Sequence, residues 1–360
     1  MRALLGLLLV GVVYLLFWPV RIEPVVWEPG PDRGQEAVFA PRQSLARSET
    51  LLTGGGQGPE DVALGPDGAY YAGMLDGRIL RFDQQGWALF ANTGGRPLGM
   101  QFNTDGHLIV ADAFAGLLSV DPSGEVRVLV SEVDGIPMLF PDDLDIAGDG
   151  TIWFTDASRR FNVHDWALDF WEGRATGRLL SFQPATGTLK VHLEQLMFAN
   201  GVALGPDDEF VLVSETLTAR VTRLWLKGPK TGSRDIFIDG LPGYPDNLSF
   251  DGELFWIALP SPRQPAIEQL ASRPWLRRLL QRLPARFRQI ELPPLGWVIA
   301  VDPAGRVRES LQDETGRCYS ITSVNRYGDD LLMGSIAMSH VCRLAFARPG
   351  QEAGTRLVSY

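Results

Sequence analysis

The sequence predicts an all-β fold in which small sheets repeat around an axis, as in a β-propeller. A short polar phrase recurs about every 40 to 60 residues, the period range of propeller blades. The phrase occupies residues 58–61, 96–99, 140–143, 198–201 and 243–247. Each copy precedes a short apolar alternation and then, in most cases, a Gly/Asp turn such as residues 148–150 and a second apolar strand.

Third strands are predicted in four of the repeats, and each is followed by a turn and a fourth strand. They cover residues 77–83, 116–121, 177–182 and 297–302. Short strands of even spacing joined by Gly/Asp turns are typical of radial β repetition. The chain has 360 residues, 45% of them hydrophobic, which is enough to form one domain of this kind.

Residues 3–20 form a nearly unbroken apolar run, at the short end of the length that crosses a membrane. We predict a transmembrane anchor over residues 1–21 rather than a cleaved signal peptide, because no small-x-small cleavage site follows the run. Arg2 precedes the run, and Tyr14 and Trp18 suit a membrane interface. The positive-inside rule then predicts a single-pass protein with a cytoplasmic N-terminus and its body on the periplasmic or extracytoplasmic side.

The rest of the chain divides by composition. Residues 22–43 are rich in Pro, Gly and charge, which predicts a tether. We assign residues 44–346 to the propeller and residues 347–360 to a C-terminal tail. The net charge of -10, with no basic face in the β part, argues against nucleic acid as a partner.

Two insertions interrupt the predicted blades. Residues 158–174 carry four aromatic side chains and His164, which predicts either a lid over a pocket or a loop packed on the neighbouring blade. Residues 267–290 have apolar side chains at helical spacing among six arginines. This pattern predicts a basic amphipathic helix over residues 273–289 with an interruption near Pro284. Such a helix can contact membrane lipid or dock on the propeller.

The chain has two cysteines, Cys318 and Cys342, and no CxxC or Cys/His cluster, which argues against a zinc site. Both lie on predicted strands of one terminal blade. They are therefore expected either to pair as a disulfide in an oxidising compartment or to be two buried thiols.

Four of the five phrases place an Asp, Glu or Asn at the same position: Glu60, Asp142, Asn200 and Asp246. If the blades surround an axis, these side chains converge on it. A ring of carboxylate and amide oxygens is a site for a hard cation, and calcium is the natural occupant. A ligand carboxylate such as Asp246 can also act as a nucleophile or base. The alternative is that these residues only cap turns.

Several segments together resemble the strictosidine synthase-like and adipocyte plasma membrane-associated protein-like family. They are residues 96–99, 110–113, 153–156, 198–202, 214–216, 242–247, 273–275 and 342–344, in a match that runs from about residue 45 to 346. The family is similar to paraoxonase, gluconolactonase and diisopropylfluorophosphatase, which are six-bladed propellers with calcium on the axis. The resemblance therefore implies six blades and an axial calcium ion.

The resemblance implies a metal-binding set of Glu60, Asp142, Asn200, Asp246 and Asn247. Asn200 matches the Asn of an Asn-Gly motif, and Asp246 matches the Asp of a Pro-Asp-Asn motif with Asn247 beside it. Asp142 stands where the pattern usually has Asn, so the added charge is expected to strengthen calcium binding. A neighbouring structural calcium ion is a further expectation, at Asp61 and Asp143.

The chain departs from the family pattern in its candidate bases. Leu98 stands where paraoxonases present a histidine, and His107 and His192 are not positioned like a catalytic base. His340, near a strand end of the last blade, is the remaining histidine candidate beside Asp246 as a catalytic residue. No residue is equated with the catalytic glutamate of strictosidine synthase, so that condensation is not expected.

These observations predict a membrane-anchored, calcium-dependent hydrolase of small apolar esters or lactones. The alternative is a non-catalytic, calcium-stabilised propeller that binds a partner or lipid. A sugar-acid lactonase is a third interpretation, which the aromatic insertion and the anchor disfavour.

Overall fold

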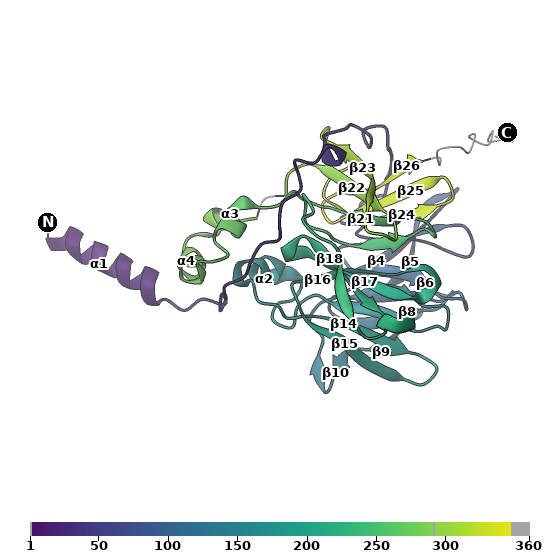
Figure 1. Ribbon diagram of the computed structural model, residues 1–360, viewed down its shortest axis with the longest axis horizontal. Helices are drawn as coiled ribbons and strands as arrows, with labels where there is room; N and C mark the ends of the chain where they lie inside the picture. The colour runs from purple at the N-terminus through teal and green to yellow at the C-terminus, as the bar shows by residue number, and fades with distance from the viewer. Residues whose placement is uncertain (1, 291, 347–360) are drawn as a thin grey trace.

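The computed structural model describes residues 2–290 and 292–346, which form a six-bladed β-propeller preceded by a helix (Figure 1). Each blade is a four-stranded antiparallel sheet, and the first strands of neighbouring blades contact one another around the axis. The predicted fold class is confirmed in its propeller part. The predicted tail, residues 347–360, lies outside the described residues.

The first three blades are regular meanders. Blade 1 contains β2 (Val62–Leu64), β3 (Tyr70–Gly73), β4 (Arg78–Asp83) and β5 (Gly86–Asn92). Blade 2 contains β6 (Pro97–Phe102), β7 (Leu108–Asp112), β8 (Gly116–Val120) and β9 (Val126–Val130). Blade 3 contains β12 (Pro141–Ile146), β13 (Ile152–Asp156), β14 (Gly177–Gln183) and β15 (Thr188–Leu196). A separate hairpin, β10 (Glu132–Val133) and β11 (Ile136–Pro137), precedes blade 3.

Blades 4 and 5 consist of consecutive strands, whereas the last blade includes a strand from the start of the chain. Blade 4 contains β16 (Ala199–Leu204), β17 (Phe210–Glu215), β18 (Arg220–Trp225) and β19 (Arg234–Ile238). Blade 5 contains β20 (Leu248–Phe250), β21 (Phe255–Ala258), β22 (Gly296–Val301) and β23 (Val307–Asp313). Blade 6 contains β24 (Ile321–Tyr327), β25 (Asp330–Ser335), β26 (His340–Ala345) and, outermost, β1 (Glu49–Leu52). Cys318 and Cys342 form a disulfide, which decides between the two alternatives left by the sequence.

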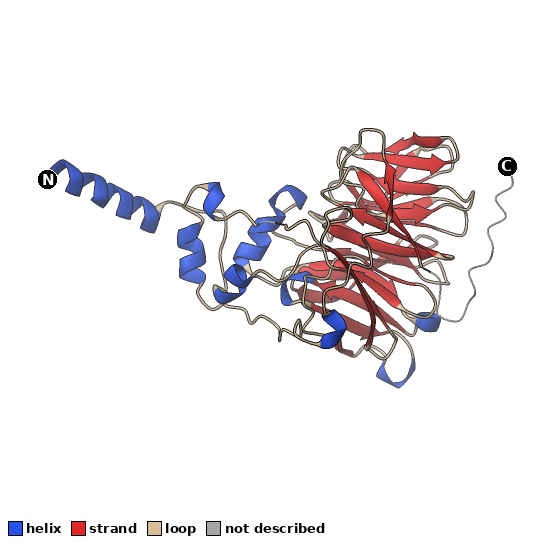
Figure 2. Cartoon of the chain, turned by 90° about the horizontal axis from the view of Figure 1, so that it is seen from above, coloured by secondary structure: helices blue, strands red, loops and turns tan. Residues whose placement is uncertain are grey.

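The helices gather on one side of the propeller (Figure 2). They are α1 (Arg2–Phe17), α2 (Trp166–Glu172), α3 (Pro265–Gln269) and α4 (Pro274–Leu280). Six short 3-10 turns lie in the described part of the chain, at Ala37–Phe39, Val163–Asp165, Pro206–Asp208, Thr216–Thr218, Gly228–Lys230 and Ala285–Phe287. Figure 1 shows α2, α3 and α4 between the blades and α1.

The transmembrane helix predicted over residues 1–21 is not supported. Helix α1 has 16 residues. Within residues 2–290 and 292–346, no helix combines the length and apolar character needed to cross a membrane.

The segment predicted as an amphipathic helix over residues 273–289 is interrupted near Pro284, as the sequence indicated: it forms α4 and a 3-10 turn at Ala285–Phe287. Arg277 of α4, however, is fully buried rather than on a basic face. The predicted tether is not free, since Ile22, Trp27 and Phe39 are buried against the body.

β-Bulges lie at the repeated phrases. In blades 2, 3 and 4 the pairing of the first and second strands shifts register between Pro97 and Met100, Pro141 and Leu144, and Ala199 and Val202. In each case two residues on the first strand oppose one on the second. Such an extra residue bends the strand and re-aims a side chain. The bulges at β12 and β16 contain Asp142 and Asn200, which face the axis rather than continuing the ladder.

Glycine lets neighbouring blades approach closely at the axis. A Cβ atom on Gly201 would lie 2.4 Å from the carbonyl oxygen of Asp246 and 2.6 Å from the backbone nitrogen of Leu248. Gly99 meets the backbone of Asp143 in the same way, 2.6 Å from its Cα atom. The two phrases that end in glycine therefore let the next blade place its own axial residue.

Gly201→Ala is expected to destabilise the fold by about 1–3 kcal/mol, because the new methyl group meets backbone that cannot rotate away. Gly148→Ala is the matched control, since its Cβ atom would lie 3.5 Å from the nearest atom, an Asp208 side-chain oxygen. Chemical denaturation of both variants measures the difference in unfolding free energy. Equal stabilities would show that the blades do not need the close approach.

Candidate metal centre

A cavity of ≈ 290 Å³ lies at the helix-covered end of the axis. Glu60, Asp142, Asn200 and Asp246 all line it, from blades 1, 3, 4 and 5, and each is at most 7% exposed. Asp142 and Asn200 lie in β12 and β16, while Glu60 and Asp246 lie just before β2 and β20. The structure thus brings together four of the five residues predicted to bind metal.

Three oxygens of this axial ring lack a hydrogen-bond partner within the described residues: Asp142 Oδ2, Asn200 Oδ1 and Asp246 Oδ1. The side chain of Asn200 is hydrogen-bonded to the carboxylate of Asp246, so its amide nitrogen is engaged and its oxygen is free. Buried polar atoms normally find partners, because desolvation without a hydrogen bond is costly. Free carboxylate and amide oxygens in one cavity fit a hard divalent cation.

The acidic residues alone do not make this centre. In the described part of the chain, no group of three or more His, Cys, Asp or Glu side chains is placed to hold a metal ion. The candidate centre combines carboxylate oxygens with the amide oxygen of Asn200, which lines the same cavity.

Burial and mutual repulsion disfavour ionisation of the ring carboxylates. Burial raises the pKa of Glu60 to about 7, against the favourable charge of Arg96. Burial also raises the pKa of Asp142 well above its usual range, and the charges of Glu60 and Asp246 add to the effect. The pKa of Asp246 is raised for the same two reasons, burial first and the Glu60 charge second. A cation in the cavity would relieve this repulsion.

Arg96 is a residue of the site that the sequence analysis missed. It is 3% exposed, lines the cavity, and donates to the Gly58 carbonyl oxygen at 2.8 Å and to Glu60 Oε2 at 3.1 Å. The first position of the repeated phrase could have indicated this residue. Arg96, Phe140, Phe198 and Tyr244 share its first position, and all four line the cavity above the ring.

The fourth position of the repeated phrase lines a different cavity. Asn247 takes the fourth position of the phrase, as Asp61 and Asp143 do, and all three line a second cavity of ≈ 150 Å³. Successive side chains of an extended segment point to opposite sides. Asn247 therefore lies beside the expected structural site rather than in the first cavity.

The residues expected to hold a structural calcium ion already have partners. Asp61 accepts hydrogen bonds from the backbone nitrogens of Val62 and Met100, and Asp143 accepts them from Leu144 and Val202, all at 2.8–2.9 Å. Met100 and Val202 belong to the next blade in each case. These carboxylates therefore join neighbouring blades through backbone hydrogen bonds.

His340 lies outside the first cavity. Its Nε2 atom is 2.9 Å from the carbonyl oxygen of Arg317. Leu98, at the place of a paraoxonase histidine, does line the cavity. Of the described histidines, His164 is the one on the cavity wall, where its ring lies 4.9 Å from that of Phe114.

Residues 158–174 form the predicted lid. Val163, His164, Trp166 and Phe170 line the cavity, with Trp166 and Phe170 on α2. Phe170 packs edge-on against Phe198 at 5.3 Å and Tyr244 at 5.6 Å between ring centroids. The lid thus completes an apolar wall above a charged floor.

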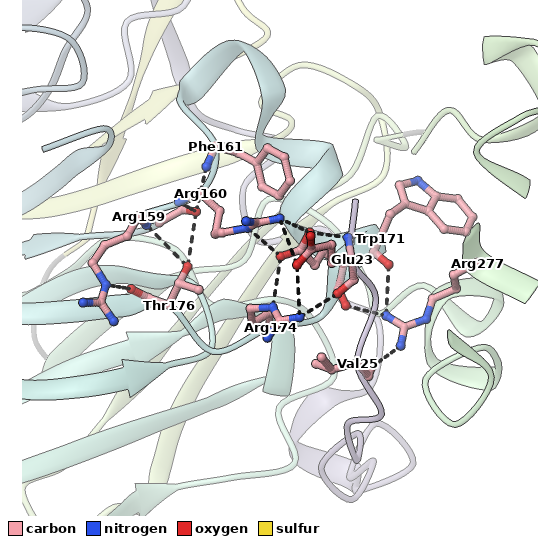
Figure 3. A network of polar contacts seen from close by, with 11 residues as sticks. Glu23, Val25, Arg159, Arg160, Phe161, Trp171, Arg174, Thr176 and Arg277 are labelled. Carbon is pink, nitrogen blue, oxygen red and sulfur yellow. Dashed lines mark hydrogen bonds and ion pairs between the residues drawn. The ribbon is translucent and has the colours of Figure 1, made fainter. Parts of the chain in front are cut away.

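The segment after α1 holds the lid in place (Figure 3). The buried carboxylate of Glu172 accepts hydrogen bonds from Arg160 Nε at 2.9 Å and from the backbone nitrogen of Glu23 at 2.7 Å. The guanidinium of Arg277 donates to the carbonyl oxygens of Trp171 and Glu172 at 3.0 Å, and also to that of Val25. We call residues 22–28 the strap, because they join α1, the lid and α4.

The fold of this six-bladed propeller is similar to that of solved structures. A gluconolactonase of Xanthomonas campestris is similar with a TM-score of 0.62 and 17% identity, covering 90% of this chain and 97% of the other. A calcium-binding regucalcin of Agrobacterium tumefaciens has a TM-score of 0.59 and 14% identity, covering 83% and 94%. At these identities the likeness shows the fold alone.

The sequence comparisons identify the family. Profiles described as "Strictosidine synthase-like, N-terminal" and "Strictosidine synthase" match residues 37–82 and 142–229. The human adipocyte plasma membrane-associated protein is 33% identical, covering 94% of this chain and 86% of its own. Arabidopsis thaliana protein STRICTOSIDINE SYNTHASE-LIKE 6 is 35% identical, covering 83% and 82%. The chain belongs to this strictosidine synthase-like, adipocyte plasma membrane-associated protein-like family, as its motifs predicted.

A chain that begins at residue 30 is expected to lose roughly 3 kcal/mol or more of stability compared with one that begins at residue 20. It lacks the buried side chains of Ile22 and Trp27, each worth about 1.5–3 kcal/mol, and leaves Arg277 without the Val25 carbonyl. Melting temperature measures the loss, and limited proteolysis within residues 158–174 measures lid order. Equal melting temperatures and cleavage rates would show that the strap does not hold the lid.

Proposed function

We propose that this protein is a membrane-associated, calcium-dependent hydrolase of small apolar esters or lactones. The observation that carries the proposal is the set of three partnerless oxygens, on Asp142, Asn200 and Asp246, at the floor of an aromatic cavity. The gluconolactonase and regucalcin neighbours, one named for lactone chemistry and one for calcium binding, support the same assignment.

The residues that line the cavity have different proposed roles, according to their position. Glu60, Asp142, Asn200 and Asp246 would hold the ion, and calcium bound there would polarise a substrate carbonyl and stabilise the charge that develops on its oxygen. Asp246 is our candidate nucleophile or base, because its Oδ1 atom is free within the described structure and faces the cavity. The wall formed by the lid and by Phe140, Phe198 and Tyr244 excludes water and receives the apolar part of the substrate.

The membrane association rests on exposed apolar surface on the helix-covered side. Most of the large apolar side chains of α1 whose exposure is described are more than 40% exposed, and so are Trp275 and Phe287 of the second insertion. Membrane lipid is the partner we propose for this surface, with the propeller on the extracytoplasmic side, where the Cys318–Cys342 disulfide is stable. The names of the adipocyte plasma membrane-associated relatives agree with a membrane association.

A non-catalytic propeller is the second candidate function, and Leu98 favours it. This leucine occupies the cavity wall where a paraoxonase would present a histidine. In that case calcium would stabilise the hub, and the cavity or its rim would bind a partner or lipid.

The full chain in detergent is expected to hydrolyse phenyl acetate and a medium-chain lactone with calcium and to stop when the ion is chelated. Asp246→Ala should reduce turnover by about 100-fold or more, since it removes both a ligand and the candidate base. Asp235→Asn, on outer strand β19, is the matched control. Full activity of Asp246→Ala would refute the assignment. A melting temperature that falls on chelation, without any turnover, would select the non-catalytic alternative.

Calcium affinity is expected to rise with pH between about 6 and 8. The pKa of Glu60 is raised to about 7, and those of Asp142 and Asp246 are also raised, so below these values protons occupy the carboxylates that calcium needs. Calorimetric titration with calcium at several pH values measures the change, and the heat should depend on the buffer because binding releases protons. A dissociation constant independent of pH over this range would contradict the ring as the binding site.

A further inference from the structure

The axial ring contains one cation as well as three carboxylates. Arg96 lies beside Glu60, and the two side chains are 3% and 6% exposed. The carboxylates of Asp142 and Asp246 face the same cavity. With all three carboxylates ionised, a bound divalent ion would leave these residues with one uncompensated negative charge. The guanidinium of Arg96 would then bring the formal charge of these four side chains and the ion to zero.

The position of Arg96 is fixed from two sides. Its Nη1 atom donates to the Gly58 carbonyl oxygen at 2.8 Å, and its Nη2 atom donates to Glu60 Oε2 at 3.1 Å. Gly58 begins the same phrase that contains Glu60, so the guanidinium spans the turn that delivers this carboxylate to the axis. One oxygen of Glu60 is held by Arg96, which leaves the other for a metal ion. A planar, permanently charged guanidinium suits such a two-point contact.

We propose that Arg96 is a positioning and charge-balancing residue: it holds Glu60 in a one-oxygen geometry and sets the calcium affinity of the ring. This inference rests on the calcium centre of the proposed function. It also deepens the substrate assignment. A neutral loaded site with an apolar wall favours uncharged esters and lactones over anionic ones, because an added anion would have no excess positive charge to meet.

The positive charge of Arg96 is expected to have opposite effects on calcium affinity and on substrate turnover. Without Arg96 the ring would carry one more negative charge and attract calcium more strongly. The same excess negative charge would oppose the negative charge that develops on a carbonyl oxygen during hydrolysis. Arg96 therefore weakens calcium binding but assists turnover, and a residue that only supported the fold would not separate the two effects.

The test compares calcium dissociation constants, by calorimetric titration of the full chain in detergent, for four variants. Arg96→Met should bind calcium about tenfold tighter or more and show a lower kcat, with KM for phenyl acetate changed less. Asp142→Asn should bind calcium more weakly. Arg96→Met/Asp142→Asn restores neutrality and should return calcium affinity toward that of the natural chain. Arg308→Met removes a guanidinium that pairs with Asp302 on the outer part of blade 5, and should change nothing.

Arg96→Lys covers the case in which Arg96→Met fails to fold, because the lysine retains the charge. It should bind calcium within about threefold of the natural chain, since charge decides the affinity. A folded Arg96→Met with unchanged or weaker calcium binding would overturn the proposal. So would a loss confined to KM, which would make Arg96 a substrate contact. With Arg96→Met unfolded, unaltered calcium binding by Asp142→Asn would also overturn it.

The same titration separates this inference from the function on which it rests. If the natural chain binds no calcium, the calcium centre and the role of Arg96 both fail. If it binds calcium but hydrolyses neither substrate, the hydrolase fails. The charge-balancing role is then decided by the calcium affinities alone.

Discussion

The organising constraint of this molecule is the convergence of buried carboxylates on the propeller axis. Glu60, Asp142 and Asp246 come from three blades and share a cavity that removes them from water. Burial raises the pKa of each, and like charges add to the effect for all three. Retaining such a cluster costs stability unless something compensates the charge. Arg96 does so in part, and a divalent cation would complete it.

The repeated four-residue phrase supplies lining residues to both cavities on the axis. Its first position supplies the upper wall, its third position supplies the ring, and its fourth position faces the opposite cavity. Where the fourth residue is Asp61 or Asp143, its carboxylate binds backbone nitrogens of the next blade. Where it is Gly99 or Gly201, the next blade approaches through the space that a side chain would fill. The two cavities therefore differ in their carboxylates: Asp142 and Asp246 each keep a free oxygen in the first, whereas Asp61 and Asp143 bind backbone nitrogens beside the second.

The part of the chain that precedes the propeller contacts the elements that cover the cavity. The strap is hydrogen-bonded to the lid through Glu172 and to α4 through Arg277 (Figure 3). Helix α1 precedes the strap by a few residues and lies on the same side of the blades (Figure 1). Helix α1 and the lid over the cavity are thus linked by one continuous segment.

The repeating pattern made the fold predictable, because each blade uses local turns and strands that its own sequence specifies. Predicted third strands agree within a residue or two with β4, β8, β14 and β22. The position of the ring residues was predictable for the same reason, since the phrase repeats. The sequence did not indicate that Asn247 lines the second cavity, because the prediction followed a neighbouring motif and not the alternation of side chains within the phrase.

The sequence by itself determined the blade repeat, the family, and the residue types that converge on the axis. Only the tertiary structure decided which oxygens remain without partners, that His340 is remote, and that Arg277 is buried in the lid network. It also showed that Arg96 pairs with Glu60. These features depend on contacts between segments far apart in the chain, and a linear pattern of polar and apolar residues does not encode which distant partner each group meets.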